Sequence, residues 1–127
     1  MAVLSSHAQE AGISWGLTSD CNAVGQGSLR PRIAVNAEGR PVVLWGDSPP
    51  KVNYVAVGND VGFLPAVEVS VPGMAPAVDD WMGSSIAATG NTIWVVMKAT
   101  PEESRPLYVR RPADGGLPRG DTLRVDP

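Results

Sequence analysis

The sequence predicts an all-β protein built from repeated four-stranded antiparallel sheets. Its 127 residues include 14 glycines and 12 prolines, which are spread between short apolar runs. This distribution is typical of many short strands joined by tight turns. The apolar runs are rich in β-branched residues, which favour strands over helices. A pattern that recurs after about 50 residues indicates that the strands are organised as repeats.

Two copies of a strand pair establish the repeat. A first strand begins with Ile-Ala at residues 33 and 86, a turn that contains glycine follows, and the next strand is apolar and carries a tryptophan. These second strands cover residues 42–45 and 93–97. They are apolar on both faces, which is typical of a strand packed between two neighbouring sheets.

Each copy continues into a third and a fourth strand. Third strands are predicted over residues 52–58 and 107–111, and fourth strands over residues 67–71 and 122–125. The fourth strands alternate apolar and polar side chains, as expected for a strand with one wetter face. Four antiparallel strands at this period are the make-up of a β-propeller blade.

The register of the repeat divides the chain into three parts. Residues 28–73 and 74–127 are each predicted to form one blade. Residues 1–27 are predicted to form half a blade, with its third strand over residues 1–6 and its fourth strand over residues 16–24. The fold class predicted is therefore all-β, as a partial propeller of four-stranded antiparallel blades.

Three turns at equivalent places in the repeat share an acidic residue followed by a glycine. They begin at residues 8, 58 and 112, and the residues that fit the pattern are Glu10, Gly12, Trp15, Asp60, Gly62, Asp114 and Gly116. The pattern resembles the Asp-box, or bacterial neuraminidase (BNR) repeat, of sialidase-like propellers. That motif reads Ser-x-Asp-x-Gly-x-Thr-Trp and joins the third strand of a blade to its fourth. All three turns depart from it: the first has Glu10 for Asp, and the other two lack the Ser, Thr and Trp.

The resemblance implies that these turns are folding anchors. In the family, the Asp accepts hydrogen bonds from turn amides, the glycine takes a positive φ, and the Trp packs between sheets. The resemblance also implies a ring of about six blades, of which this chain supplies only a part. Two blades alone leave sheet faces and an edge exposed, so we expect a homo-oligomer that completes the propeller. A fragment of a longer propeller is the alternative.

The candidate site residues lie where the chain enters each of the two blades. Asp79, Asp80 and Trp81 occupy the loop that enters the second blade, on the side where propeller ligands bind, and Arg30 begins the first blade. These four are the predicted ligand-binding residues, with Trp81 as the surface on which a sugar could stack. Sialidases of the resembled family bind a carboxylate through arginines and use an Asp as general acid. Arg32 and Asp80 are therefore the catalytic candidates, with solvated arginines and loop-capping carboxylates as the structural alternative.

Composition and motifs limit the functional classes. The net charge is −3, so the basic surface that nucleic acids and anionic membranes require is not expected. His7 and Cys21 are each the only residue of their kind, so we expect no metal site, and no cofactor-binding motif is present. No apolar run approaches the length of a membrane span. Residues 1–4 lack the features of a signal peptide, whereas the resemblance suggests a secreted or cell-surface protein.

Two functional hypotheses follow. The first is a non-catalytic β-propeller module that self-assembles and binds glycans or proteins on its loop face. The alternative is an enzyme, a fragment of an exo-sialidase or related glycoside hydrolase. We favour the first, because the catalytic groups of the resembled family come from blades all around the ring and two blades contain only some of them.

Overall fold

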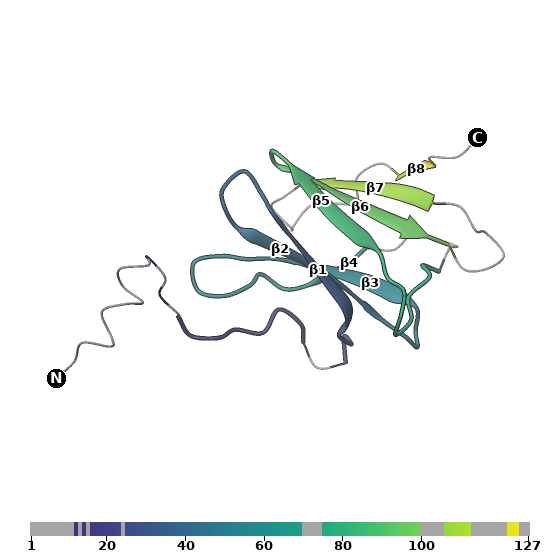
Figure 1. Cartoon of the computed structure of the whole chain (residues 1–127), viewed down its shortest axis with the longest axis horizontal. Coiled ribbons are helices and arrows are strands. Elements are labelled where there is room, and N and C mark those ends of the chain that lie inside the picture. The colour runs from purple at the N-terminus through teal and green to yellow at the C-terminus, as the bar shows by residue number, and fades with distance from the viewer. Residues whose placement is uncertain are drawn as a thin grey trace.

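The fold is all-β in the part of the chain that is described, and it contains two antiparallel sheets (Figure 1). The computed structural model describes residues 12, 14, 16–23, 25–69, 75–99, 106–112 and 122–124. Within these ranges the regular structure consists of strands, without a helix. Accordingly, no described segment is a helix long and apolar enough to cross a membrane.

Sheet 1 contains β1 (Leu29–Val35), β2 (Pro41–Asp47), β3 (Val52–Val57) and β4 (Val67–Glu68), paired in that order. All four strands lie where the sequence predicts strands. β4 is shorter than the predicted strand over residues 67–71, but the pairing extends past it, because the Val69 amide donates a hydrogen bond to the Asn53 carbonyl oxygen at 2.8 Å.

Sheet 2 repeats this arrangement further along the chain. It contains β5 (Ser85–Thr89), β6 (Thr92–Lys98), β7 (Pro106–Pro112) and β8 (Thr122–Arg124), again paired in sequence order. The predicted strand positions are confirmed here as well. The short connections explain the topology, because tight turns join strands that are antiparallel neighbours.

The hydrophobic core lies between the two sheets. We call the face of each sheet that meets the other sheet its inward face, and the opposite one its outward face. The buried aliphatic cluster contains Val42, Leu44, Val55, Val57 and Val69 from sheet 1 and Ile93, Val95 and Met97 from β6. Ile86 of β5 packs against this cluster. Removal of these side chains from water is the main source of stability in such a fold.

The first strands of the two sheets, β1 and β5, are neighbours (Figure 1). At one end, the Ala37 amide in the β1–β2 turn donates to the Gly90 carbonyl oxygen in the β5–β6 turn at 3.1 Å. At the opposite end, Asn53 Nδ2 donates to Ser84 Oγ at 2.9 Å. Both ends of the stack are therefore joined by hydrogen bonds between the two repeats.

The segment before β1 differs from the prediction. Residues 16–23 form no strand, so the strand predicted over residues 16–24 is wrong for that stretch. Residues 16–20 are all exposed, and Leu17 is their only large apolar residue, so the stretch lacks the alternating face that holds a strand on a sheet. Nearer to β1, the chain rests on sheet 1, because Trp45 Nε1 donates to the Gln26 carbonyl oxygen at 2.9 Å. The third strand predicted over residues 1–6 lies outside the described residues.

The second strands are less buried on their outward faces than predicted. Trp45 is buried and stacks on Tyr54 with ring centroids 5.8 Å apart. On β6, however, Trp94 and Val96 are only half-buried, whereas the residues that alternate with them are fully buried. Apolar side chains on both faces therefore do not bring full burial on both faces here.

Candidate functional site

The candidate site lies at one end of the two sheets. Because the strands are antiparallel, the start of β1, the β2–β3 turn and the segment that enters β5 meet at the same end. A pocket of about 340 Å³ opens there, lined by Leu29, Ser48, Asp79, Asp80 and Trp81. Three of the predicted ligand-binding residues therefore line one pocket.

A tight turn presents Asp80 and Trp81 to solvent. The Asp79 amide donates to the Met82 carbonyl oxygen at 2.8 Å, and the Met82 amide donates back to the Asp79 carbonyl oxygen at 3.2 Å. The two residues between them form the tip of the turn. Trp81, the one aromatic side chain in the pocket lining, is 72% exposed. An indole held open to water on a hydrogen-bonded turn is a ready surface for a flat apolar partner.

The two carboxylates of this turn differ in their surroundings. Lys51 Nζ lies 3.2 Å from Asp79 Oδ1 and 3.1 Å from Asp79 Oδ2, so the Asp79 charge is matched by a cation from the β2–β3 turn. Both side chains are about one-third exposed. Asp80 is exposed, and within the described ranges it has no ion pair or hydrogen bond. Asp80 therefore has both oxygens available to accept hydrogen bonds from a ligand.

Arg30 lies beside the pocket and is not part of its lining. The pairing of β1 with β2 shifts register between Leu29 and Arg32, and Arg30 has φ +49° at this irregularity. Positive φ is unusual for a residue with a side chain, and bulges of this kind reorient neighbouring side chains. A Cβ on Gly83 would lie 2.7 Å from the Arg30 Cβ, so glycine allows the loop to approach β1 closely.

Arg32 is also outside the pocket lining. It is exposed on β1, opposite Leu44 of β2 in the register. Of the two catalytic candidates, Asp80 lines the pocket and Arg32 does not.

Sequence reasoning missed Leu29, Ser48 and Lys51 as members or neighbours of this site. The turn signal Ser48-Pro49-Pro50 between two predicted strands was available in the sequence. In an antiparallel sheet, that turn falls at the same end as the loop that enters the next sheet. The predicted strand order was therefore enough to place Lys51 and Asp79 at the same end of the sheets.

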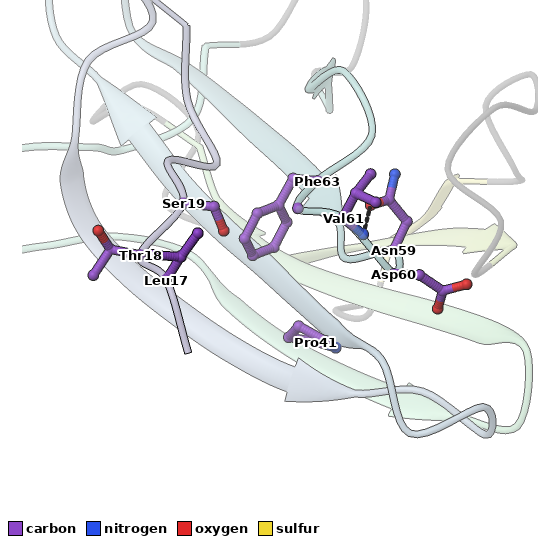
Figure 2. A pocket seen from close by; sticks show the side chains of 9 residues that line it. Leu17, Thr18, Ser19, Pro41, Asn59, Asp60, Val61 and Phe63 are labelled. Carbon is purple, nitrogen blue, oxygen red and sulfur yellow. Dashed lines mark hydrogen bonds between the residues drawn. The ribbon is translucent and has the colours of Figure 1, made fainter. Parts of the chain in front are cut away.

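The β3–β4 turn of sheet 1 is organised by Asn59 (Figure 2). Asn59 Oδ1 accepts a hydrogen bond from the Val61 amide at 2.9 Å, and the Asn59 amide donates to the Gly62 carbonyl oxygen at 2.9 Å. The Asp60 side chain is 92% exposed and its described partner is Arg40, at 3.6 Å. The role expected of the Asp-box carboxylate is therefore filled by the residue before it, because Asn makes the same side-chain turn. Gly62 has the expected positive φ, +155°.

A second, open pocket lies beside this turn. Figure 2 shows Phe63 between the turn and the segment with Leu17, Thr18 and Ser19. Its one carboxylate is Asp60, which faces Arg40. This pocket is a gap under the segment that precedes β1, and it gathers no set of reactive groups.

The remaining residues that were predicted to form Asp-box turns are mostly outside the described ranges. Glu10, Trp15, Asp114 and Gly116 are not described, whereas Gly12 is exposed with φ +70°. Among the described residues, no three His, Cys, Asp or Glu side chains gather in a group that could hold a metal ion. Cys21 is half-buried, and burial raises the pKa of its thiol.

Comparisons with protein-family models, with curated proteins and with solved structures find no match for this chain.

Proposed function

We propose that the chain is a non-catalytic module of propeller-type blades, which assembles with further copies of itself and binds a carbohydrate beside Trp81. The observation that supports it best is the stacking of two consecutive four-stranded sheets with β1 next to β5. Successive propeller blades have this relation: each is a four-stranded antiparallel sheet, and their first strands gather around the axis.

The chemistry of the pocket favours a sugar over an apolar ligand. A sugar ring has a C–H face that packs on an aromatic ring and hydroxyl groups that donate hydrogen bonds. Trp81 offers the aromatic surface, and Asp80 and Ser48 offer acceptors beside it. The volume of about 340 Å³ falls at the small end of the range for ligand pockets, roughly 300–1,000 Å³. Such a pocket suits a single sugar ring at the end of a glycan.

A binding role needs fewer groups than catalysis. In the alternative, a sialidase-type glycosidase, several arginines must surround the substrate carboxylate and a carboxylic acid must protonate the leaving group. Arg32 lies outside the lining of the pocket that contains Asp80. Sheets 1 and 2 alone therefore support the binding module better than the enzyme.

A glycan array followed by calorimetric titration of the bound sugar tests the proposal. Trp81→Ala should weaken binding by at least about tenfold, which corresponds to loss of one aromatic contact. Asp80→Asn should also weaken binding, because it removes a charged acceptor while it keeps the shape. Leu64→Ala, an exposed apolar residue on the β3–β4 connection, is the matched control and should bind normally.

Two results would count against the proposal. Absence of any bound glycan would remove the carbohydrate role, and equal binding by Trp81→Ala would refute the placement of the sugar beside Trp81. Turnover of a fluorogenic sialoside that is abolished by Arg32→Ala or Asp80→Ala would favour the enzyme instead.

A further inference from the structure

The sequence repeat makes each outward face of the protein equivalent to one of the two inward faces that form its core. In sheet 1, Ile33 of β1 lies opposite Val43 of β2, and in sheet 2, Ile86 of β5 lies opposite Val95 of β6. Side chains directly opposite each other in an antiparallel pair share one face. The outward face of sheet 1 that carries Ile33 is therefore the counterpart, in the repeat, of the inward face of sheet 2 that carries Ile86.

These counterparts differ sharply in burial. Ile86 packs against the core cluster and Val95 is fully buried, because sheet 1 covers that face. Ile33 is 67% exposed and Val35, the next residue on the same face, is 60% exposed. We call the set of exposed Ile33, exposed Val35 and half-buried Val43 the Ile33 face. It presents aliphatic side chains of the kind that the core buries elsewhere in this protein.

The outward face of sheet 2 has the reciprocal relation. Ala87 lies opposite Trp94, and Ser85 lies opposite Val96. By the same repeat, this face is the counterpart of the inward face of sheet 1, where Val42 and Leu44 are buried against sheet 2. We call the set Ala87 and Val96 the Val96 face.

We infer that copies of this protein associate head to tail, with the Val96 face of one copy packed on the Ile33 face of the next. This rests on the self-assembly in the proposed function and names the surfaces that carry it. The two faces are the separate halves of an interface that the chain already forms once, between its own sheets. Such a contact joins two different surfaces, so repetition leads to a closed ring or to an open filament.

Charge and coverage at the edges of the two faces agree with this pairing. Lys98, at the end of the Val96 face, and Glu68, on the Ile33 side of sheet 1, are exposed and opposite in charge. Opposite charges on two surfaces favour their encounter and orientation. Among the described residues before β1, Gln26 lies on the Ile33 side of sheet 1 at Trp45, whereas Ile33 and Val35 are largely exposed.

Two variants with one broken face each test the inference. The first carries Ile33→Asp and Val35→Asp, and the second carries Ala87→Asp and Val96→Asp. Each should have the mass of one chain by light scattering at micromolar concentration, where the unmodified protein is oligomeric. An equimolar mixture of the two should form a dimer and nothing larger, because one intact Ile33 face and one intact Val96 face remain. Ala37→Asp, in the β1–β2 turn, adds a carboxylate outside both faces and should leave the oligomer unchanged.

The outcomes separate the inference from the proposed function. A monomeric unmodified protein would overturn self-assembly itself. If both variants remain oligomeric like the unmodified protein, the pairing of these faces is refuted and self-assembly stands. If only the first variant loses the oligomer, two Ile33 faces meet in it, which also contradicts the inference. Circular dichroism and thermal melting of each variant separate a lost interface from a lost fold, since Ile33, Val35 and Ala87 are exposed.

Discussion

The buried hydrogen bond from Asn53 to Ser84 joins sheet 1 to the segment that enters sheet 2. A substitution that deletes one oxygen atom, Ser84→Ala, removes it. Asn53 Nδ2 donates to Ser84 Oγ at 2.9 Å, and the two residues are 1% and 5% exposed. Ser84→Ala deletes the acceptor and leaves a buried amide group without it. We expect this change to destabilise the protein although it fills no space and opens almost none.

The magnitude follows from the burial of the donor. A buried polar group that loses its partner costs about 1–3 kcal/mol, whereas a typical intact hydrogen bond contributes about 1 kcal/mol net. Ser84→Ala should therefore lower the free energy of unfolding by about 1–3 kcal/mol. In a double-mutant cycle with Asn53→Ala, the coupling energy between the two positions should be about 1 kcal/mol, because the second change then removes a group that has already lost its partner.

Urea unfolding measures this loss, with the fluorescence of the tryptophans, among them buried Trp45, as the signal. Protein concentration must be the same for every variant, because association shifts the midpoint with concentration. Ser85→Ala is the matched control, since Ser85 is the exposed neighbour on β5, and its effect should stay within about 0.5 kcal/mol. A Ser84→Ala effect equal to that of the control, or strict additivity with Asn53→Ala, would refute the view that this bond ties the sheets together.

Three further predictions concern the inter-sheet core, the close approach of Gly46 to Val78 and the thiol of Cys21. Leu44→Ala should lower the free energy of unfolding by about 2–5 kcal/mol, because Leu44 is buried in the inter-sheet cluster; a loss below about 1 kcal/mol in urea would contradict that packing. Gly46→Ala should cost about 1–3 kcal/mol by the same measurement, since the added Cβ meets the Val78 side chain, and an unchanged midpoint would exclude this contact. Cys21 should be alkylated more slowly at neutral pH in the folded protein than in urea, because burial raises the pKa of its thiol and lowers the thiolate fraction. The folded rate should approach the unfolded rate as the pH rises; equal rates at neutral pH would contradict the prediction.

The strand positions could be predicted from sequence because two independent signals agree on them. Apolar β-branched runs define the strands and Gly- or Pro-containing turns define their ends, and the same order occurs twice in the chain. Short turns between consecutive runs then leave little choice but antiparallel neighbours. The placement of Asp80 and Trp81 in an exposed loop at the end of the sheets follows from the same pattern.

The individual hydrogen bonds and ion pairs of the site could not be predicted from sequence. They join side chains that are distant in the sequence or that could replace each other chemically. Asn59 and Asp60 are adjacent, and the side chain of either can accept a hydrogen bond from a turn amide. Only the geometry identifies Asn59 as the acceptor. The ion pair between Lys51 and Asp79 joins two turns of different repeats. The strand predicted over residues 16–24 rested on repeat register alone, without an apolar alternation in the residues themselves.

The mass of the unmodified protein in solution tests most directly the central claim, that the stacking of the two sheets continues into further copies. Light scattering coupled to size exclusion measures it at micromolar concentration, with circular dichroism to verify the β-sheet fold. We expect a whole-number multiple, above one, of the chain mass of 13.3 kDa. A folded protein with the mass of a single chain would contradict the claim.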